Sequence, residues 1–97
     1  EKSQCSYNFS ESNPDNLRKL FEIYQAEANN LIEKKLIYPA LDFVLKCSHT
    51  FNLLDARGVI SVTDRAQYIE KIRKLAREVA SSWVEERELL EYPLIRN

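Results

Sequence analysis

Few side chains in this sequence could do chemistry, and their spacing excludes the common catalytic and metal sites. The chain has two cysteines, Cys5 and Cys47, and one histidine, His49. A structural zinc site needs four ligands, and these three residues cannot supply them. Cys47 and His49 diverge by about 200° on a helix, so they do not form a nucleophile and base pair. The single glycine, Gly58, cannot build a glycine-rich phosphate loop. We therefore predict no catalytic, cofactor-binding or metal-binding residue in this chain.

A run of basic residues is the main candidate for a binding surface. Between Arg65 and Arg77 the only acidic residue among several cations is Glu70. Helical spacing places four cations on the face opposite Ile69, Ile72, Ala76 and Val79; these four are Lys71, Arg73, Lys74 and Arg77. We call them the basic strip, and it could contact phosphates or a partner surface. The alternative is a solvated helix face, which the lack of interleaved aromatic residues favours.

Arg65 is interpreted as structural, because the same spacing places it on the apolar side of its helix. A buried charge is costly unless it is paired. Asp55 and Asp42 lie on the inward line of the preceding helix and are its expected partners. The paired carboxylates of Glu85, Glu86 and Glu88 are interpreted as solubilising charge on an exposed helix.

The composition is that of one small globular domain. Among 97 residues, 44% are hydrophobic and 30% are charged, with a net charge of −1, so general attraction to nucleic acid or acidic lipid is absent. One glycine and three prolines are too few for the turns of a β-rich fold. No apolar run approaches the roughly 20 residues of a membrane span, so no membrane partner is expected. A Cys5–Cys47 disulfide is one interpretation, but reduced thiols are the expectation, and they are typical of a cytoplasmic protein.

The periodicity predicts an all-α fold, a small antiparallel three-helix bundle with a long C-terminal helix. We expect helices near residues 14–36, 39–57 and 62–90. Asn13-Pro14 has the form of a helix start, Gly58 that of a C-terminal cap, and Ser61 to Asp64 that of a capping box. The third helix is longer than a small domain is wide, so its end should project or rest on a part that the chain lacks. The expected core consists of Leu20, Tyr24, Leu41, Val44, Leu45, Phe51, Ile69, Ile72, Ala76, Val79 and Trp83.

The first residues are expected to differ from the rest. Residues 1–12 show neither helical nor strand periodicity, whereas residues 13–97 are expected to form the helical domain. Tyr7 and Phe9 leave two interpretations open, a disordered tail or an arm that docks on the body. The start at Glu1 instead of Met is typical of a piece of a longer protein or of a processed product.

One long block carries a family resemblance. The run KCSHTFNLLDARG at residues 46–58, followed by ISVTDR at 60–65 and Tyr68-Ile69, closely resembles the C-terminal part of the α subunit of bacterial glycyl-tRNA synthetase of the α2β2 type. Tyr7-Asn8-Phe9 also fits the family. The C-terminal Tyr92-Pro93 fits as well, although Glu91 replaces a glycine that the family usually has.

The resemblance implies a class II synthetase as the parent enzyme, which activates glycine with ATP and magnesium and charges tRNA(Gly). It implies that residues 1–12 lead in from the absent catalytic core, and that residues 13–97 are a non-catalytic helical domain, inactive alone. Its implied partners are the β subunit, a second α subunit in the heterotetramer, and tRNA(Gly) as a further candidate. The alternatives are a free-standing helical protein-interaction module or an RNA-binding module.

Overall fold

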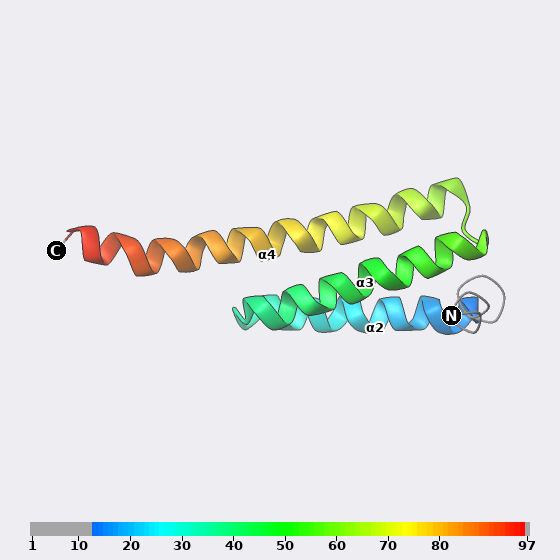
Figure 1. Cartoon of the computed structure of the whole chain (residues 1–97), viewed down its shortest axis with the longest axis horizontal. Helices are drawn as coiled ribbons and strands as arrows, with labels where there is room; N and C mark the ends of the chain where they lie inside the picture. Colours follow the sequence, from blue (N-terminus) through cyan, green and yellow to red (C-terminus); the bar gives the residue numbers. More distant parts are fainter. Residues whose placement is uncertain (1–12, 97) are drawn as a thin grey trace, which may run out of the picture.

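The computed structural model describes residues 13–96, with side chains through residue 90, and within this range the chain forms three helices and no strand. They are α2 (Pro14–Glu33), α3 (Ile37–Arg57) and α4 (Val62–Arg96). Each helix runs antiparallel to the one before it, so α4 returns along α3 in the direction of α2 (Figure 1). The predicted all-α three-helix bundle with a long C-terminal helix is therefore confirmed.

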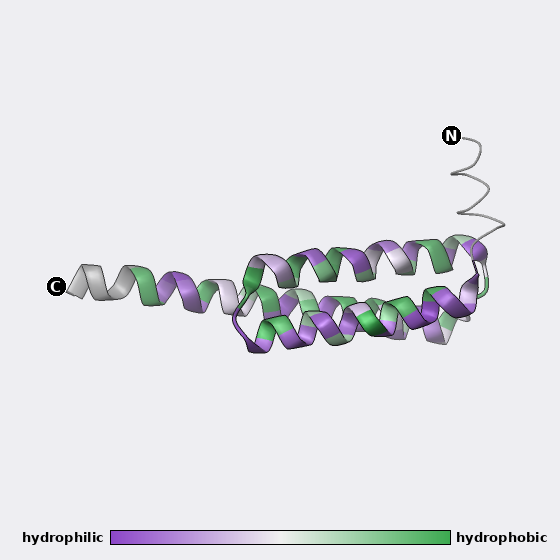
Figure 2. Ribbon diagram, turned by 90° about the horizontal axis from the view of Figure 1, so that it is seen from below, coloured by the Kyte–Doolittle hydropathy of each residue, from purple (hydrophilic) through white to green (hydrophobic). Residues whose placement is uncertain are grey.

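The last helix extends well past the other two. α4 has 35 residues, against 20 in α2 and 21 in α3. At 1.5 Å per residue it is about 52 Å long, so its C-terminal part lies beyond the α2–α3 pair. Hydrophobic positions continue along this overhang (Figure 2). The expected projection of the C-terminal end is therefore present.

Both predicted helix starts form through side-chain caps. Asn13 Oδ1 accepts hydrogen bonds from the backbone amides of Asp15 at 2.9 Å and Asn16 at 3.2 Å. At the start of α4, Ser61 Oγ accepts the amide of Asp64 at 3.1 Å. These oxygens satisfy amides that have no partner within the helix.

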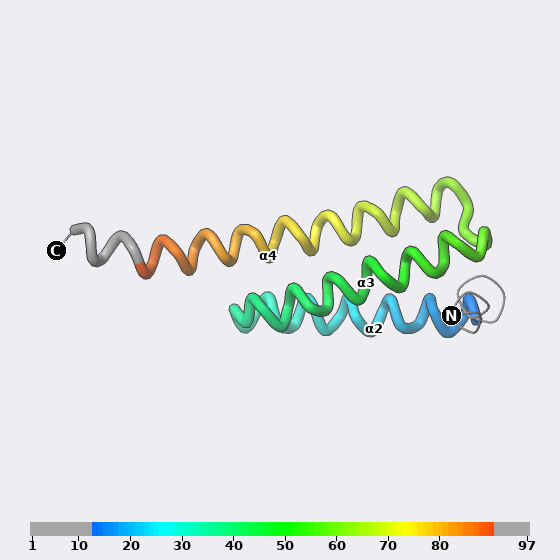
Figure 3. The backbone as a smooth tube through the Cα atoms, in the orientation of Figure 1, coloured from blue at the N-terminus to red at the C-terminus, as the bar shows by residue number. Residues whose placement is uncertain are grey.

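The two links lie at opposite ends of the bundle (Figure 3). The α2–α3 link begins earlier than predicted, because α2 ends at Glu33 and not near residue 36. There the Lys35 amide binds Ile32 O at 3.0 Å and the Leu36 amide binds Leu31 O at 2.9 Å. This is a Schellman ending, which needs a left-handed residue after the cap. Lys35 takes that role with a φ of 62°, whereas sequence reasoning searches for a glycine there.

Pro39 is the third residue of α3 instead of its first, because the helix begins at Ile37. The missing amide of Pro39 costs no helical bond, since first-turn amides have no acceptor within the helix. The first bond of this helix joins the Ala40 amide to Leu36 O at 3.0 Å. At the other end Gly58 is left-handed with a φ of 70°, which confirms the predicted cap.

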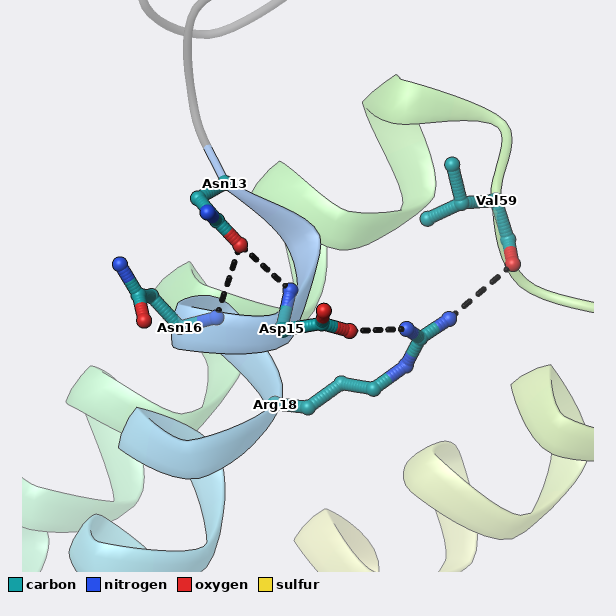
Figure 4. Close-up of polar contacts among 5 residues, drawn as sticks. All are labelled: Asn13, Asp15, Asn16, Arg18 and Val59. Carbon is teal, nitrogen blue, oxygen red and sulfur yellow. Dashed lines mark hydrogen bonds and ion pairs between the residues drawn. The ribbon is translucent and has the colours of Figure 1, made fainter.

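One arginine ties the start of α2 to the α3–α4 link (Figure 4). Arg18 Nη2 donates to Val59 O at 3.2 Å, while Arg18 Nη1 lies 3.4 Å from Asp15 Oδ1. The guanidinium group therefore connects the start of α2 to the α3–α4 link at the level of the Asn13 cap.

The core lies mainly along α3, which contributes most of the buried residues. Phe21 and Tyr68 pack edge to face with ring centroids 4.7 Å apart. Most of the buried apolar residues belong to one cluster, formed by Phe21, Ala28, Ile37, Ala40, Val44, Cys47, Phe51, Leu75 and Val79. A second, smaller cluster near the start of α2 contains Leu17, Leu53 and Leu54. The three helices therefore share a single side of α3 as their common packing surface.

The predicted core was right in part. Val44, Phe51 and Val79 are buried, and four more predicted members are partly buried, namely Leu20, Tyr24, Ile69 and Ile72. Four members were wrong, because Leu41, Leu45, Ala76 and Trp83 are exposed. Apolar residues surround much of α3, so periodicity alone chose the line next to the one that packs inward. Trp83 was misplaced because α4 is leaving the bundle at that level.

Candidate functional site

The basic strip lies on the exposed side of α4, as helical spacing predicted, but two of its four cations are engaged within the helix. Arg77 Nη2 lies 2.9 Å from Glu70 Oε2, and the Lys71 ammonium lies 5.5 Å from the centroid of the Tyr68 ring. The hydrogen bond and charge of Arg77, with a smaller effect from Arg73, lower the pKa of Glu70. Arg73 and Lys74 therefore carry most of the charge that the strip offers to a partner.

A shallow hollow adjoins the strip where α4 passes the end of α2. Lys74 and Arg77 of the strip line it, together with Ile32 of α2. The remaining lining comes from α4, namely Glu78, Ser81 and Ser82. Sequence analysis did not find this hollow, because residues about 45 positions apart form it.

Arg65 pairs with Asp55 but not with Asp42. Arg65 Nε lies 3.3 Å from Asp55 Oδ1, with the two side chains 52% and 41% exposed. The predicted position of Arg65 on a buried side is therefore wrong, because Arg65 lies in the first turn of α4, where every residue from 62 to 66 is exposed. Asp42 lies near the start of α3, more than three turns before Asp55, where it lines a groove against α2. An ion pair this exposed contributes little stability, about 0–1 kcal/mol.

A second ion pair joins the α2–α3 link to the overhanging part of α4. Lys35 Nζ lies 3.3 Å from Glu85 Oε2, and both side chains are exposed. Sequence analysis interpreted Glu85 only as solubilising charge, since no local pattern connects positions 50 residues apart.

Cys47 and His49 point in different directions. Cys47 is a free thiol, fully buried, and its Sγ lies 4.0 Å from Phe21 O. Burial raises the pKa of this thiol to about 11, so it is almost entirely protonated at neutral pH. His49 is exposed on the groove side of α3. The arrangement leaves Cys47 as a core residue, and its partner in the alternative disulfide, Cys5, lies outside the described residues.

The α2–α3 groove has both apolar and polar side chains in its lining, and sequence analysis missed it. Leu17, Leu20 and Tyr24 line it from α2. From α3 it is lined by Asp42, Leu45, Lys46, His49, Thr50 and Leu53. Leu45 is 59% exposed within it. The groove is therefore open to solvent and partly apolar.

Two kinds of feature are absent among the described residues. Among them no three His, Cys, Asp or Glu side chains gather closely enough to hold a metal ion. None of the helices in that part of the chain has the length and hydropathy needed to cross a membrane. The fold is that of a helical bundle, and its candidate sites are surfaces, namely the basic strip, the hollow beside it and the α2–α3 groove.

The family follows from comparison with known families. The family model of the glycyl-tRNA synthetase alpha subunit matches residues 1–88 of the 97-residue chain. The chain therefore belongs to the glycyl-tRNA synthetase alpha subunit family, which is a family of ligases that act in protein biosynthesis. The match includes the groove, the basic strip and the first part of the overhang.

Proposed function

We propose that this chain is the non-catalytic helical part of a class II glycyl-tRNA synthetase α subunit, and that it makes subunit contacts. The parent enzyme activates glycine with ATP and transfers it to tRNA(Gly) in the cytoplasm. The observation that carries this proposal is the family match over residues 1–88. The partners we propose are the β subunit and a second α subunit.

The overhang of α4 supports a protein partner. Large apolar side chains are exposed on it, and they are Trp83, Val84, Leu89 and Leu90. Exposed apolar residues that gather on one projecting element are typical of protein interaction sites. The overhang also carries Glu85, Glu86 and Glu88, so a complementary partner has apolar side chains flanked by cations.

The basic strip makes tRNA a second candidate partner. Arg73 and Lys74 are exposed and could contact phosphates, as Arg77 could after exchanging Glu70 for a phosphate. That exchange would break an existing ion pair, so the strip favours tRNA less strongly than its sequence indicates.

We place ATP and magnesium elsewhere in the parent enzyme. The described residues have no metal-binding cluster, and Gly58 closes a helix instead of opening a phosphate loop. We therefore assign no catalytic step to this chain.

Glycine-dependent ATP–pyrophosphate exchange tests the proposal. The complete α subunit, measured with and without β, should catalyse the exchange, and the purified 97-residue chain should not exceed a buffer blank. Exchange by the 97-residue chain alone would contradict its assignment as a non-catalytic part.

Charge reversal distinguishes the two kinds of partner. If the strip contacts tRNA, Arg73→Glu with Arg77→Glu in the complete enzyme should raise KM for tRNA and leave pyrophosphate exchange unchanged. The salt dependence of tRNA binding should also fall by about one unit for each lost phosphate contact. If the strip contacts protein, the same change should loosen the α–β assembly on a sizing column. Lys19→Glu, an exposed cation on α2, is the matched control.

A further inference from the structure

The α2–α3 groove has the form of a site for an apolar segment. Leu20 and Tyr24 are half-buried along one wall, and Leu45 is 59% exposed on the other. Two exposed polar side chains, Lys46 and His49, also line the groove. A segment that places two large apolar side chains along the groove would bury this surface.

We propose that the N-terminal arm, residues 1–12, occupies this groove through Phe9 and Tyr7. The proposal concerns the chain itself and does not rest on the function proposed above. These two aromatic residues are two positions apart, so an extended backbone directs both to the same side. The polar residues around them, Ser6, Asn8 and Ser10, would then face solvent.

The length of the arm fits the length of the groove. The arm joins the described chain at Asn13, and the groove begins one turn into α2, at Leu17. Along the helix axis, Leu20 lies about 10 Å and Tyr24 about 16 Å from Asn13. With the turn at residues 12–14, extended backbone carries Phe9 about 10 Å and Tyr7 about 17 Å from Ser12. An arm that folds back along α2 therefore brings Phe9 to the level of Leu20, and Tyr7 to the level of Tyr24 and Leu45.

The residues at the junction are suited to that reversal. The segment Ser12 to Pro14 consists of a serine, an asparagine and a proline, which are typical of turns. Because the arm is tethered at the end of the groove, its effective concentration there is in the millimolar range, far above that of a free partner. The tether therefore favours the arm over a second copy of the chain as the occupant.

Nuclear Overhauser effects in the unmodified 97-residue chain test the contact directly. With methyl-labelled leucines, the ring protons of Phe9 and Tyr7 should show cross-peaks to the methyl groups of Leu20 and Leu45. Cross-peaks from these rings to side chains outside the groove would overturn the proposal. The absence of any cross-peak from them to α2 or α3 would overturn it as well.

A double-mutant cycle in the full chain measures the energetic link. Phe9→Ala and Leu20→Ala should be non-additive, with a coupling of about three- to tenfold in the equilibrium constant of unfolding. Phe9→Ala and Ile23→Ala should be additive, because Ile23 is 60% exposed on α2 and does not line the groove. Additivity in both cycles would refute the arm as the occupant. Concentration-dependent dimerisation that Leu45→Asp abolishes would assign the groove to a second copy and would overturn the proposal as well.

Discussion

Replacing Leu75 by alanine tests whether α4 packs on the α2–α3 pair as described. Leu75 is 2% exposed and belongs to the main core cluster with Phe21 and Val44. Truncation removes three buried carbon groups at about 0.8 kcal/mol each, and the remaining cavity adds to this loss. We expect a loss of about 3 kcal/mol in the free energy of unfolding. For a domain of this size, that loss lowers Tm by about 12–24 °C.

Urea denaturation followed by two probes is the suitable assay. Far-UV circular dichroism reports all three helices, whereas fluorescence of Trp83, the single tryptophan, reports α4. The two transitions should coincide if the described bundle unfolds as one unit. Leu90→Ala is the matched control, because Leu90 is 61% exposed on the same helix, and it should change stability by less than about 0.5 kcal/mol. Ile72→Ala should fall between the two, since Ile72 is half-buried.

Two results would refute this reasoning. Equal effects of Leu75→Ala and Leu90→Ala would mean that α4 does not bury its Leu75 side in solution. A Trp83 transition at lower urea than the circular dichroism transition would mean that α4 detaches before the other helices unfold.

Further predictions concern three positions, Lys35, Cys47 and Asn13. Lys35→Gly should be more stable than Lys35→Ala by about 1 kcal/mol in chemical denaturation, because both variants lose the ion pair to Glu85 but only glycine relieves the left-handed strain; equal stabilities would contradict the Schellman geometry. In a Cys5→Ser background, Cys47 should react with a disulfide reagent at least about a hundredfold more slowly than in the unfolded chain, because its raised pKa leaves about a hundredfold less thiolate. The native thiol also keeps its proton between pH 9 and about 11 where the unfolded thiol loses it, so stability should fall as the pH rises through that range, and a rise would refute the sign. Asn13→Ala should cost about 1 kcal/mol by thermal denaturation, and Asn29→Ala in the exposed middle of α2 should be nearly neutral.

Local chemistry explains what the sequence could predict. The caps at Asn13, Gly58 and Ser61 form where expected, because each depends on one side chain or one backbone conformation within a few residues. The end of α2 was placed three residues late, because a lysine occupies the left-handed position that glycine usually takes. Local rules therefore identify these helix ends, but they placed the end of the last helix near residue 90, whereas α4 continues through Pro93 to Arg96.

Features that depend on packing were harder to predict. The exposed ion pair of Arg65 was expected to be buried, because its helix spacing is apolar, but the residues of that turn are exposed. Glu70 reduces the free charge of the basic strip, although its i+7 partner Arg77 is not a usual helical pairing distance. The groove between Leu20 and Leu45 arises only when two helices come together. Each of these depends on how one helix is rotated against another, which periodicity does not specify.

The overhang of α4 makes this helix a mechanical lever. Among the described side chains, Val79 is the last buried apolar one on α4, and the helix continues to Arg96. That arm is about 25 Å long at 1.5 Å per residue, so a tilt of about 5° around Val79 would move its tip by about 2 Å. The exposed Lys35–Glu85 ion pair lies between Val79 and Arg96, where it resists such a tilt. A partner that holds the overhang would therefore transmit small displacements directly to the side of α4 that packs against Phe21 and Phe51.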